Sequence, residues 1–194
     1  GVPYAILHYQ AGKTGMSIKE VIQRKMVKSE GAESGQKPGA TAITEGEKID
    51  FLVRQHIGNE YDEKPMISHV VVEDFDEDGL LDVIVCDALD NYVSWIRQYP
   101  ENVFTETILG SDLIAPAHVQ VKDFDLDGDK DLLVAVLGLL YPSNDKIGSI
   151  VFLENDGDFN FTSHLIIERI ARVSDVRAGD LDGDGDLDLA VAQF

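Results

Sequence analysis

Acidic residues at alternate positions around a glycine mark three short segments of the sequence. They begin at residues 74, 123 and 180 and read DFDEDGLLD, DFDLDGDKD and DLDGDGDLD; we name them loops 1, 2 and 3. Alternate side chains in a tight turn can converge on one point, to which a backbone carbonyl adds a further oxygen. A ligand set made only of oxygen suits a hard divalent cation, and calcium fits it best. The spacing therefore predicts one Ca²⁺ per loop and three per chain.

The predicted ligands occupy equivalent positions in each loop. They are the carboxylates at positions one, three, five and nine and the backbone carbonyl at position seven, with glycine at position six for the tight turn. The full set is Asp74, Asp76, Asp78, Leu80 and Asp82 in loop 1, Asp123, Asp125, Asp127, Asp129 and Asp131 in loop 2, and Asp180, Asp182, Asp184, Asp186 and Asp188 in loop 3, where Leu80, Asp129 and Asp186 contribute the carbonyl.

The alternatives are another cation, another calcium motif, or no ion. Magnesium prefers a smaller octahedral shell that keeps several waters, and transition metals favour His or Cys, which the loops lack. An EF-hand needs flanking helices and a glutamate at position twelve, where this chain has Val85, Val134 and Val191. A single loop could be an acidic turn that binds nothing. Crowded carboxylates repel one another, however, and their recurrence in three equivalent places favours calcium.

Segments typical of β-strands stand on both sides of each loop. HVVVE, HVQVK and DVRAG precede loops 1, 2 and 3, and apolar segments continue from their last aspartates. Two further strand candidates follow in each complete repeat: residues 92–100 and 102–110 in the first, and residues 149–157 and 159–168 in the second. Each repeat is therefore predicted to form four antiparallel strands, with an inserted loop at residues 141–148 of the second repeat.

Repeats of four short strands predict an all-β fold, the β-propeller of four-stranded antiparallel blades, because one blade cannot bury both of its faces alone. The chain holds about three such repeats, and the last ends at Phe194 after its second strand. Propellers usually have four to eight blades. We therefore expect this chain to be part of a longer protein.

Residues 1–49 do not fit the repeat and form a predicted segment of their own, separate from the propeller repeats at residues 50–194. Ser17 to Glu20 has the pattern of a capping box, which predicts a short helix near residues 18–28, and a linker follows. This segment has seven Lys/Arg and five Asp/Glu, a net charge of +2. The basic side of the helix is either a solvated face or a docking surface for the acidic repeats or a partner.

Composition excludes several classes of function. The 194 residues are 44% hydrophobic, as in a packed globular chain, and the formal net charge of −20 argues against binding to nucleic acid or to an anionic membrane surface. Cys86 is the single cysteine and lies in an apolar segment, which favours a buried structural thiol. No apolar segment is long enough to span a membrane, and the first ten residues lack the pattern of a signal peptide.

Together these features resemble the FG-GAP and VCBS repeat families, calcium-loop β-propellers related to the head of integrin α-subunits. The resemblance rests on the three loops, the apolar strands around them, and the element WIRQ at residues 95–98, repeated as FLEN at residues 152–155. It covers about residues 50–194. It implies that each loop joins the first and second strands of a blade, that the aspartates named above bind calcium, and that the protein is secreted or surface-exposed. The Phe-Gly and Gly-Ala-Pro elements are missing, so the VCBS variety is the closer match.

The sequence shows no convincing catalytic constellation. The five histidines are dispersed, and His69 and His118 occupy the same position of successive repeats, which favours packing over catalysis. We therefore expect a non-enzymatic, calcium-stabilised propeller that binds a protein or glycan partner in an extracellular, cell-surface or periplasmic setting, alone or as a subunit of a larger complex. The alternative is the scaffold of a larger secreted hydrolase or lyase, or a redox-complex subunit, with an active site outside this fragment.

Overall fold

The computed structural model describes residues 4–6, 9–11, 49–51, 55–61 and 64–194. These residues form strands, turns and loops, and contain no helix. The helix predicted near residues 18–28 lies outside them. Contacts divide the chain into two compact units, Tyr4–His56 and a larger unit that runs from Ile57 to Phe194. No helix in the described part is long and apolar enough to cross a membrane.

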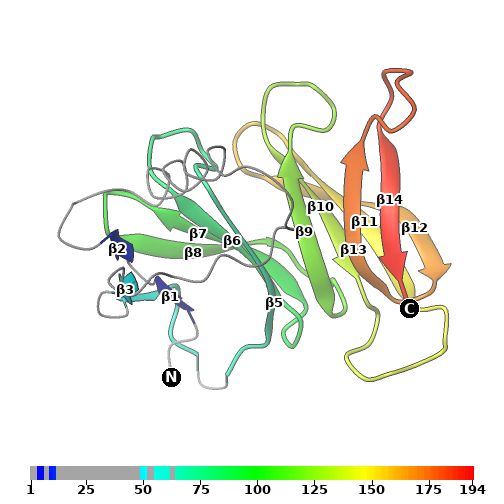
Figure 1. Cartoon of the computed structure of the whole chain (residues 1–194), viewed down its shortest axis with the longest axis horizontal. Coiled ribbons are helices and arrows are strands. Elements are labelled where there is room, and N and C mark those ends of the chain that lie inside the picture. The colour runs from blue at the N-terminus through cyan, green and yellow to red at the C-terminus, as the bar shows by residue number, and fades with distance from the viewer. Residues whose placement is uncertain (1–3, 7–8, 12–48, 52–54, 62–63) are drawn as a thin grey trace, which may run out of the picture. The chain divides into compact units, whose positions relative to one another are not determined.

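Two four-stranded antiparallel sheets make up most of the larger unit (Figure 1). The first has the order β5 (Ile67–Glu73), β6 (Asp82–Asp87), β7 (Tyr92–Gln98) and β8 (Phe104–Gly110). The second has the order β9 (Pro116–Lys122), β10 (Asp131–Val136), β11 (Gly148–Asn155) and β12 (Phe161–Ile170). A third, two-stranded sheet pairs β13 (Val173–Gly179) with β14 (Asp188–Gln193). Neighbours in each sheet are also neighbours in sequence, as the repeat pattern predicts.

Four short strands lie nearer the N-terminus. β1 (Tyr4–Ile6) pairs with β4 (Gln55–Ile57), and β2 (Tyr9–Ala11) pairs with β3 (Ile49–Phe51). The residues between β10 and β11 form a loop, at the place where the sequence predicts an insertion.

Strand β10 shows how the sheets are held together. All six of its residues are buried, because it is covered on both faces. Leu132 and Val134 pack in a core with Ile84 and Trp95 of the first sheet. The alternate residue Leu133 faces the other way, into a second core shared with β13. Period-two alternation therefore divides one strand between two cores, so that three successive sheets pack face to face.

The first strands of the three sheets lie next to one another, since β9 contacts both β5 and β13. This is the arrangement in which successive blades place their first strands on the inside of a propeller. The three sheets in the described part of the chain do not close into a ring. The all-β fold with four-stranded antiparallel sheets is thus established, and the complete propeller stays a prediction.

Candidate metal centres

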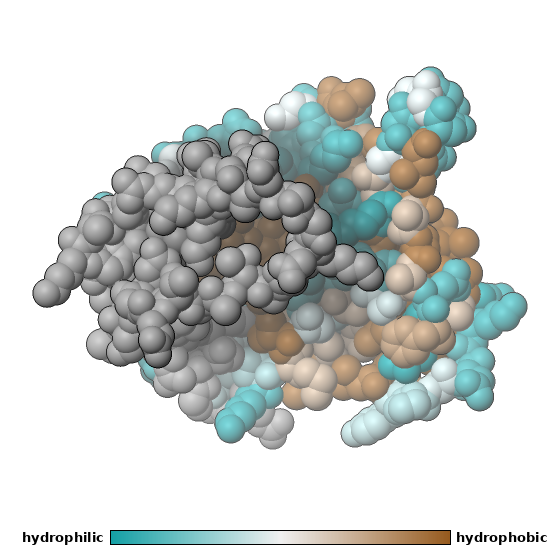
Figure 2. Space-filling model, in the orientation of Figure 1, coloured by the Kyte–Doolittle hydropathy of each residue, from teal (hydrophilic) through white to brown (hydrophobic). Residues whose placement is uncertain are grey.

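The three acidic loops occupy equivalent places in the fold. Loop 1 joins β5 to β6, loop 2 joins β9 to β10, and loop 3 joins β13 to β14. Each therefore connects the first and second strands of a sheet, and loops 2 and 3 stand at the upper edge of the view in Figure 1. Figure 2 shows mainly hydrophilic surface over the tip of loop 3, whereas the tip of loop 2 also carries a hydrophobic patch.

The backbone of each loop turns in the same way. Glycine at position six has a positive φ in all three, with values of 93° at Gly79, 107° at Gly128 and 97° at Gly185. Position four is also left-handed, yet only loop 3 has a glycine there; loop 2 has Leu126 with φ of 66°. Side chains other than glycine rarely adopt this region. The glycine at position six is thus a conformational requirement of the turn.

Hydrogen bonds within each loop hold the carboxylates in place. The first aspartate accepts the backbone N–H of the glycine at position six, at 3.0 Å in loop 1 and 3.2 Å in loops 2 and 3. The third- and fifth-position aspartates each accept the N–H two residues further on, at distances of 2.8 to 3.3 Å. In loops 2 and 3 the first aspartate also accepts, through its other oxygen, the N–H of position four at 2.7 Å. The aspartates at positions three and five use one oxygen each in these bonds, which orient the second. The same pattern in three loops shows that sequence spacing, and not chance packing, sets the geometry.

Three carboxylates of each loop converge. One oxygen from each lies within 4.8 Å of the others in the following groups: Asp74, Asp76 and Asp78; Asp123, Asp125 and Asp127; and Asp180, Asp182 and Asp188. In loop 1, Asp74 Oδ1 is buried and accepts no hydrogen bond from the described part of the chain. A buried oxygen without a donor is costly unless a cation or water satisfies it. These oxygen-only clusters fit a hard divalent cation.

The remaining predicted ligands stand apart from those clusters. Asp82 and Asp131, at position nine of loops 1 and 2, are buried and direct both carboxylate oxygens at backbone N–H groups. Asp184 of loop 3 accepts the N–H of Asp186 and does not join the cluster. The metal roles of these three residues and of the carbonyls of Leu80, Asp129 and Asp186 stay predictions.

The last residue of the third strand hydrogen-bonds to the acidic loop in each of the two four-stranded sheets. Gln98 donates its backbone N–H to Asp82 and its side-chain amide to the carbonyl of Leu81 at 2.9 Å. Asn155 does the same with Asp131 and with the carbonyl of Lys130. The repeated Gln/Asn of WIRQ and FLEN was visible in the sequence, but its role was not, because its partners lie 16 to 25 residues away in the chain.

Electrostatic crowding is strongest in loop 2. Partial desolvation, followed by the neighbouring charges of Asp127 and Asp131, raises the pKa of Asp129 to about 6. Desolvation is also the first cause that raises the pKa of Asp125 and Asp131. A bound divalent cation would oppose both effects by stabilising the ionised forms. Loop 2 is therefore a set of carboxylates that gains from a cation.

The two repeated histidines form a separate cluster, in which His118 is buried and His69 is half-buried. The rings of His69 and His118 lie 4.1 Å apart, centroid to centroid, and Asp175 occupies the equivalent position of the third sheet. His118 Nδ1 lies 3.2 Å from Asp175 Oδ1 without the orientation of a hydrogen bond. Burial, and next the neighbouring His69, lower the pKa of His118 to about 4. A buried imidazole of this kind packs between the sheets, as the repeated position predicts.

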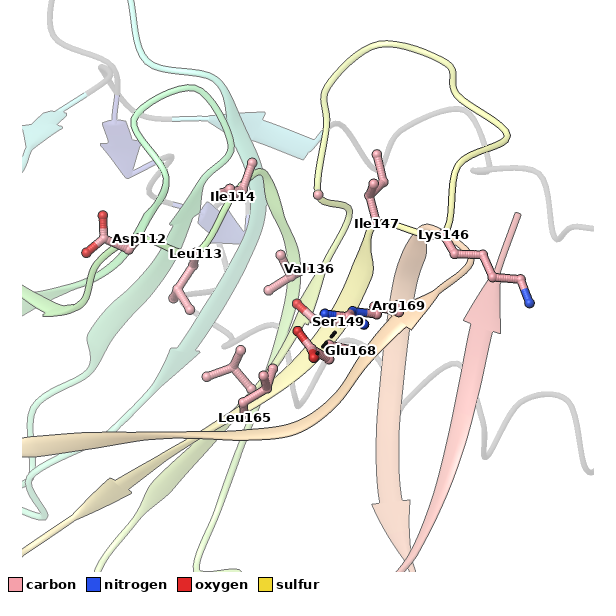
Figure 3. A pocket seen from close by; sticks show the side chains of 12 residues that line it. Asp112, Leu113, Ile114, Val136, Lys146, Ile147, Ser149, Leu165, Glu168 and Arg169 are labelled. Carbon is pink, nitrogen blue, oxygen red and sulfur yellow. Dashed lines mark ion pairs between the residues drawn. The ribbon is translucent and has the colours of Figure 1, made fainter.

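The larger unit also has an open cavity of about 390 Å³ beside the link from β8 to β9 (Figure 3). Its apolar side includes Leu113 and Leu165, and its polar side carries Ser149 and the Glu168–Arg169 ion pair, 3.6 Å long. The lining contains no histidine, no cysteine and no converging carboxylates.

Fold and loops together define a class: an all-β repeat protein whose blade-like sheets carry acidic, metal-type turns. Residues 74–134 and 135–191 each match the family model of the FG-GAP-like repeat. These segments cover more than half of the chain, which therefore belongs to the FG-GAP-like repeat family, as the resemblance predicts. No curated protein and no solved structure matches the chain significantly.

Proposed function

We propose that this chain is a calcium-stabilised module of the β-propeller type, in which each acidic loop binds one Ca²⁺. The observation that carries the proposal is the recurrence of one turn geometry, with the same hydrogen bonds and a three-carboxylate cluster, in three loops at the same place in successive sheets. Three Ca²⁺ ions add six positive charges and change the formal net charge from −20 to −14. The ions relieve repulsion and tie the first strand to the second.

Exposed apolar residues support the propeller. Val70 and Val72 of β5, the first strand and one edge of its sheet, are 47% and 59% exposed. Leu189 of β14 is also exposed. Flanking blades would cover such residues in a closed ring, because each blade packs both faces against neighbours.

The role we propose for the module is recognition of a protein or glycan partner, outside the cell, at its surface or in the periplasm. Calcium loops of extracellular modules work at about 10⁻⁴ to 10⁻³ M calcium, which these compartments supply. The buried His118, packed against His69, supports a non-catalytic role, because an imidazole with a pKa of about 4 is a poor base near neutral pH.

Calcium binding is tested by thermal melting and by an ion count. We expect the melting temperature to fall by many degrees when a chelator replaces calcium, and native mass spectrometry to show calcium ions on the folded chain. Asp125→Asn with Asp127→Asn should remove one ion, because both carboxylates belong to the cluster of loop 2. A melting temperature that is the same with calcium and with chelator, or an unchanged ion count in this variant, would contradict the proposal.

The matched control is the acidic turn after β11. Asp156→Asn with Asp158→Asn removes the same two charges from a turn that lies outside the three carboxylate clusters. The ion count should stay as in the parent chain. Loss of an ion here would mean that general negative charge, and not loop geometry, attracts calcium.

Partner recognition requires a second measurement. The immobilised chain, loaded with calcium, is probed with an array of glycans and with candidate secreted proteins, and the same probes are repeated with chelator. Binding that disappears with calcium supports a calcium-held recognition surface. A hydrolase or lyase activity of this chain on any bound glycan would contradict the non-catalytic role.

A further inference from the structure

Arg97 of β7 places a positive charge against loop 1. Its Nη2 lies 2.5 Å from Asp76 Oδ2 and 3.8 Å from Asp78 Oδ2. Both carboxylates belong to the oxygen cluster of this loop, and the Asp76 side chain is only 3% exposed. An ion pair with one buried partner is screened by salt much less than a fully exposed pair. Loop 1 thus already has a counter-charge from its own sheet.

Two aromatic rings hold the guanidinium in this position. Its central carbon lies 5.5 Å from the ring centroid of Trp95 and 5.0 Å from that of Tyr99. Cations over aromatic faces are attracted within about 6 Å. Arg97 is therefore positioned beside the cluster by neighbours on its own strand and its extension, independently of the carboxylates.

The second sheet has the opposite charge at the equivalent place. Ile96 pairs with the residue after Asp82, and Leu153 pairs with the residue after Asp131, so Arg97 and Glu154 occupy matching positions. Glu154 contacts His164 at 2.5 Å and does not neutralise loop 2. Among the residues that the structure describes, no ion pair joins a Lys or Arg to an aspartate of loop 2 or loop 3.

Lys130 adds to this difference between the loops. It belongs to loop 2 but extends to loop 1, where its ammonium donates to the backbone carbonyl of Asp74 and lies 3.8 Å from Glu73 Oε1. Two cations from the protein therefore border loop 1. The carboxylates that a calcium ion needs there are partly neutralised before it arrives.

From this asymmetry we propose that Arg97 is the resident counter-cation of loop 1 and competes with calcium for Asp76 and Asp78. Calcium then fills loops 2 and 3 first and enters loop 1 at higher free concentration, displacing the guanidinium. This inference rests on the proposed calcium function and adds an order of filling to it. Loop 1 becomes the site that responds to changes in calcium, and the other two loops are structural.

Trp95 makes loop 1 separately observable. It is the single tryptophan of the chain, and its ring packs 5.3 Å from that of Phe75, within loop 1. Terbium ions, which replace calcium, luminesce when a nearby excited indole transfers energy to them. Terbium luminescence excited through Trp95 is therefore expected to include an ion in loop 1, and the loss of that signal in Asp76→Asn with Asp78→Asn assigns it to this loop. Native mass spectrometry with calcium counts all sites.

The decisive comparison is the parent chain against Arg97→Gln. We expect the parent to bind two calcium ions before the third, and the Trp95-sensitised terbium signal to appear at the later step. In Arg97→Gln the terbium affinity read through Trp95 should tighten by about tenfold or more, since one unit charge beside the ion is removed. The reciprocal control, Glu154→Arg, should weaken the binding of one calcium ion and leave the terbium affinity read through Trp95 unchanged.

The possible results distinguish a failure of this inference from a failure of the proposed calcium binding. Three ions of equal affinity in the parent chain, or an unchanged Trp95-read affinity in Arg97→Gln, would overturn the inference and leave calcium binding in place. Absence of bound ions from every chain would overturn both. Melting in chelator gives a readout without metal: Arg97→Gln should melt lower than the parent because loop 1 loses its counter-charge, and an equal melting temperature would count against the inference.

Arg97→Lys serves if the glutamine variant does not fold. Lysine keeps the charge but lacks the planar guanidinium that spans two carboxylates and stacks on rings. The Trp95-read terbium affinity should lie between those of the parent chain and a neutral variant such as Arg97→Met. Competition by residue 97 would be refuted if neither Arg97→Lys nor Arg97→Met bound terbium more tightly than the parent chain.

Discussion

Asn155 donates its backbone N–H to Asp131 Oδ1 at 2.9 Å, across the mouth of loop 2. Oδ2 of the same carboxylate accepts the N–H of Phe124 at 3.1 Å. Asp82 is held in the same way by Gln98 and Phe75 in the first sheet. The last aspartate of loops 1 and 2 thus joins the start of the loop to the third strand by two hydrogen bonds, whether or not it also binds a metal. We call this pair of hydrogen bonds the bracket.

Removal of this bracket should destabilise the fold even without calcium. Asp131→Ala would leave the N–H groups of Asn155 and Phe124 without their acceptor in a buried site. We expect a loss of about 3 kcal/mol in the free energy of unfolding, since each unsatisfied buried donor costs about 1 to 3 kcal/mol. Urea unfolding in chelator measures it. Asp188→Ala, in the more exposed loop 3, is the matched control and should cost less; equal losses would contradict the bracket.

The glycine at position six of each loop should resist substitution. Gly128 has φ of 107°, in a region that L side chains rarely adopt, although a Cβ there would meet no neighbour within 4 Å. Gly128→Ala is therefore expected to cost about 1 to 2 kcal/mol through backbone strain alone. Thermal and urea unfolding in chelator test this. Unchanged stability would show that the loop relaxes at no cost.

The non-glycine residue at position four gives the converse test. Leu126 has φ of 66° and is 84% exposed, so its side chain contributes little packing to offset the strain. Loop 3 has glycine at this position. Leu126→Gly removes the backbone strain of the folded chain and should raise the free energy of unfolding. The free energy of unfolding should stay unchanged if the greater entropy of glycine in the unfolded chain cancels that gain. A loss above about 1 kcal/mol, the usual cost of glycine, would contradict strain at this site.

The pH dependence of stability should carry a contribution from His118. The folded chain holds its pKa near 4, through burial first and then through His69 and Arg177 against the opposing charge of Asp175, whereas an unfolded histidine titrates near 6.5. The unfolded state therefore binds more protons between these values. The free energy of unfolding should fall as the pH drops from about 6.5 to about 4, by up to about 1.4 kcal/mol per pH unit.

His118→Gln isolates this contribution from the carboxylates. The stability advantage of the parent chain over the variant should shrink as the pH falls through that window and should be constant above pH 7. Urea unfolding at constant calcium, measured at each pH, gives the difference. A parallel pH profile for the two chains would show that His118 titrates normally.

Cys86 should be inert in the folded chain. It lies in β6 with no exposed surface, and burial raises the pKa of its thiol to about 12. The thiolate that reacts with disulfide reagents is therefore absent near neutral pH. We expect no labelling of the native chain and one labelled thiol per chain in urea. Rapid labelling under native conditions would contradict the packing of β6.

The strands could be predicted with useful accuracy from short-range pattern. The predicted segment at residues 92–100 contains β7 at Tyr92–Gln98, and the segment at residues 159–168 largely overlaps β12 at Phe161–Ile170. Turn residues and apolar runs carry this information locally. The turn geometry of the acidic loops was predictable for the same reason, since the Asp–backbone bonds inside each loop span two to seven residues.

Other roles could not be read from local pattern. Asp82 and Asp131 were predicted only as ligands, yet their carboxylates also hold the third strand, a contact that requires β6 and β7 or β10 and β11 to be paired. Arg97 lies 21 residues from Asp76 in the sequence, and Lys130 lies 56 residues from Asp74. Side chains can cross such separations only after the sheets have assembled.

The sequence by itself therefore determined the repeat, the order of strands within each sheet, the place of the three loops and the oxygen-rich character of their sites, because all of these follow from residue type at short spacing. The tertiary structure alone decided how the loops differ. It set Arg97 and Lys130 beside loop 1, left Glu154 beside loop 2, and brought His69 against His118. Charge and burial at a site depend on which strands become neighbours, and that is a property of the packed sheets.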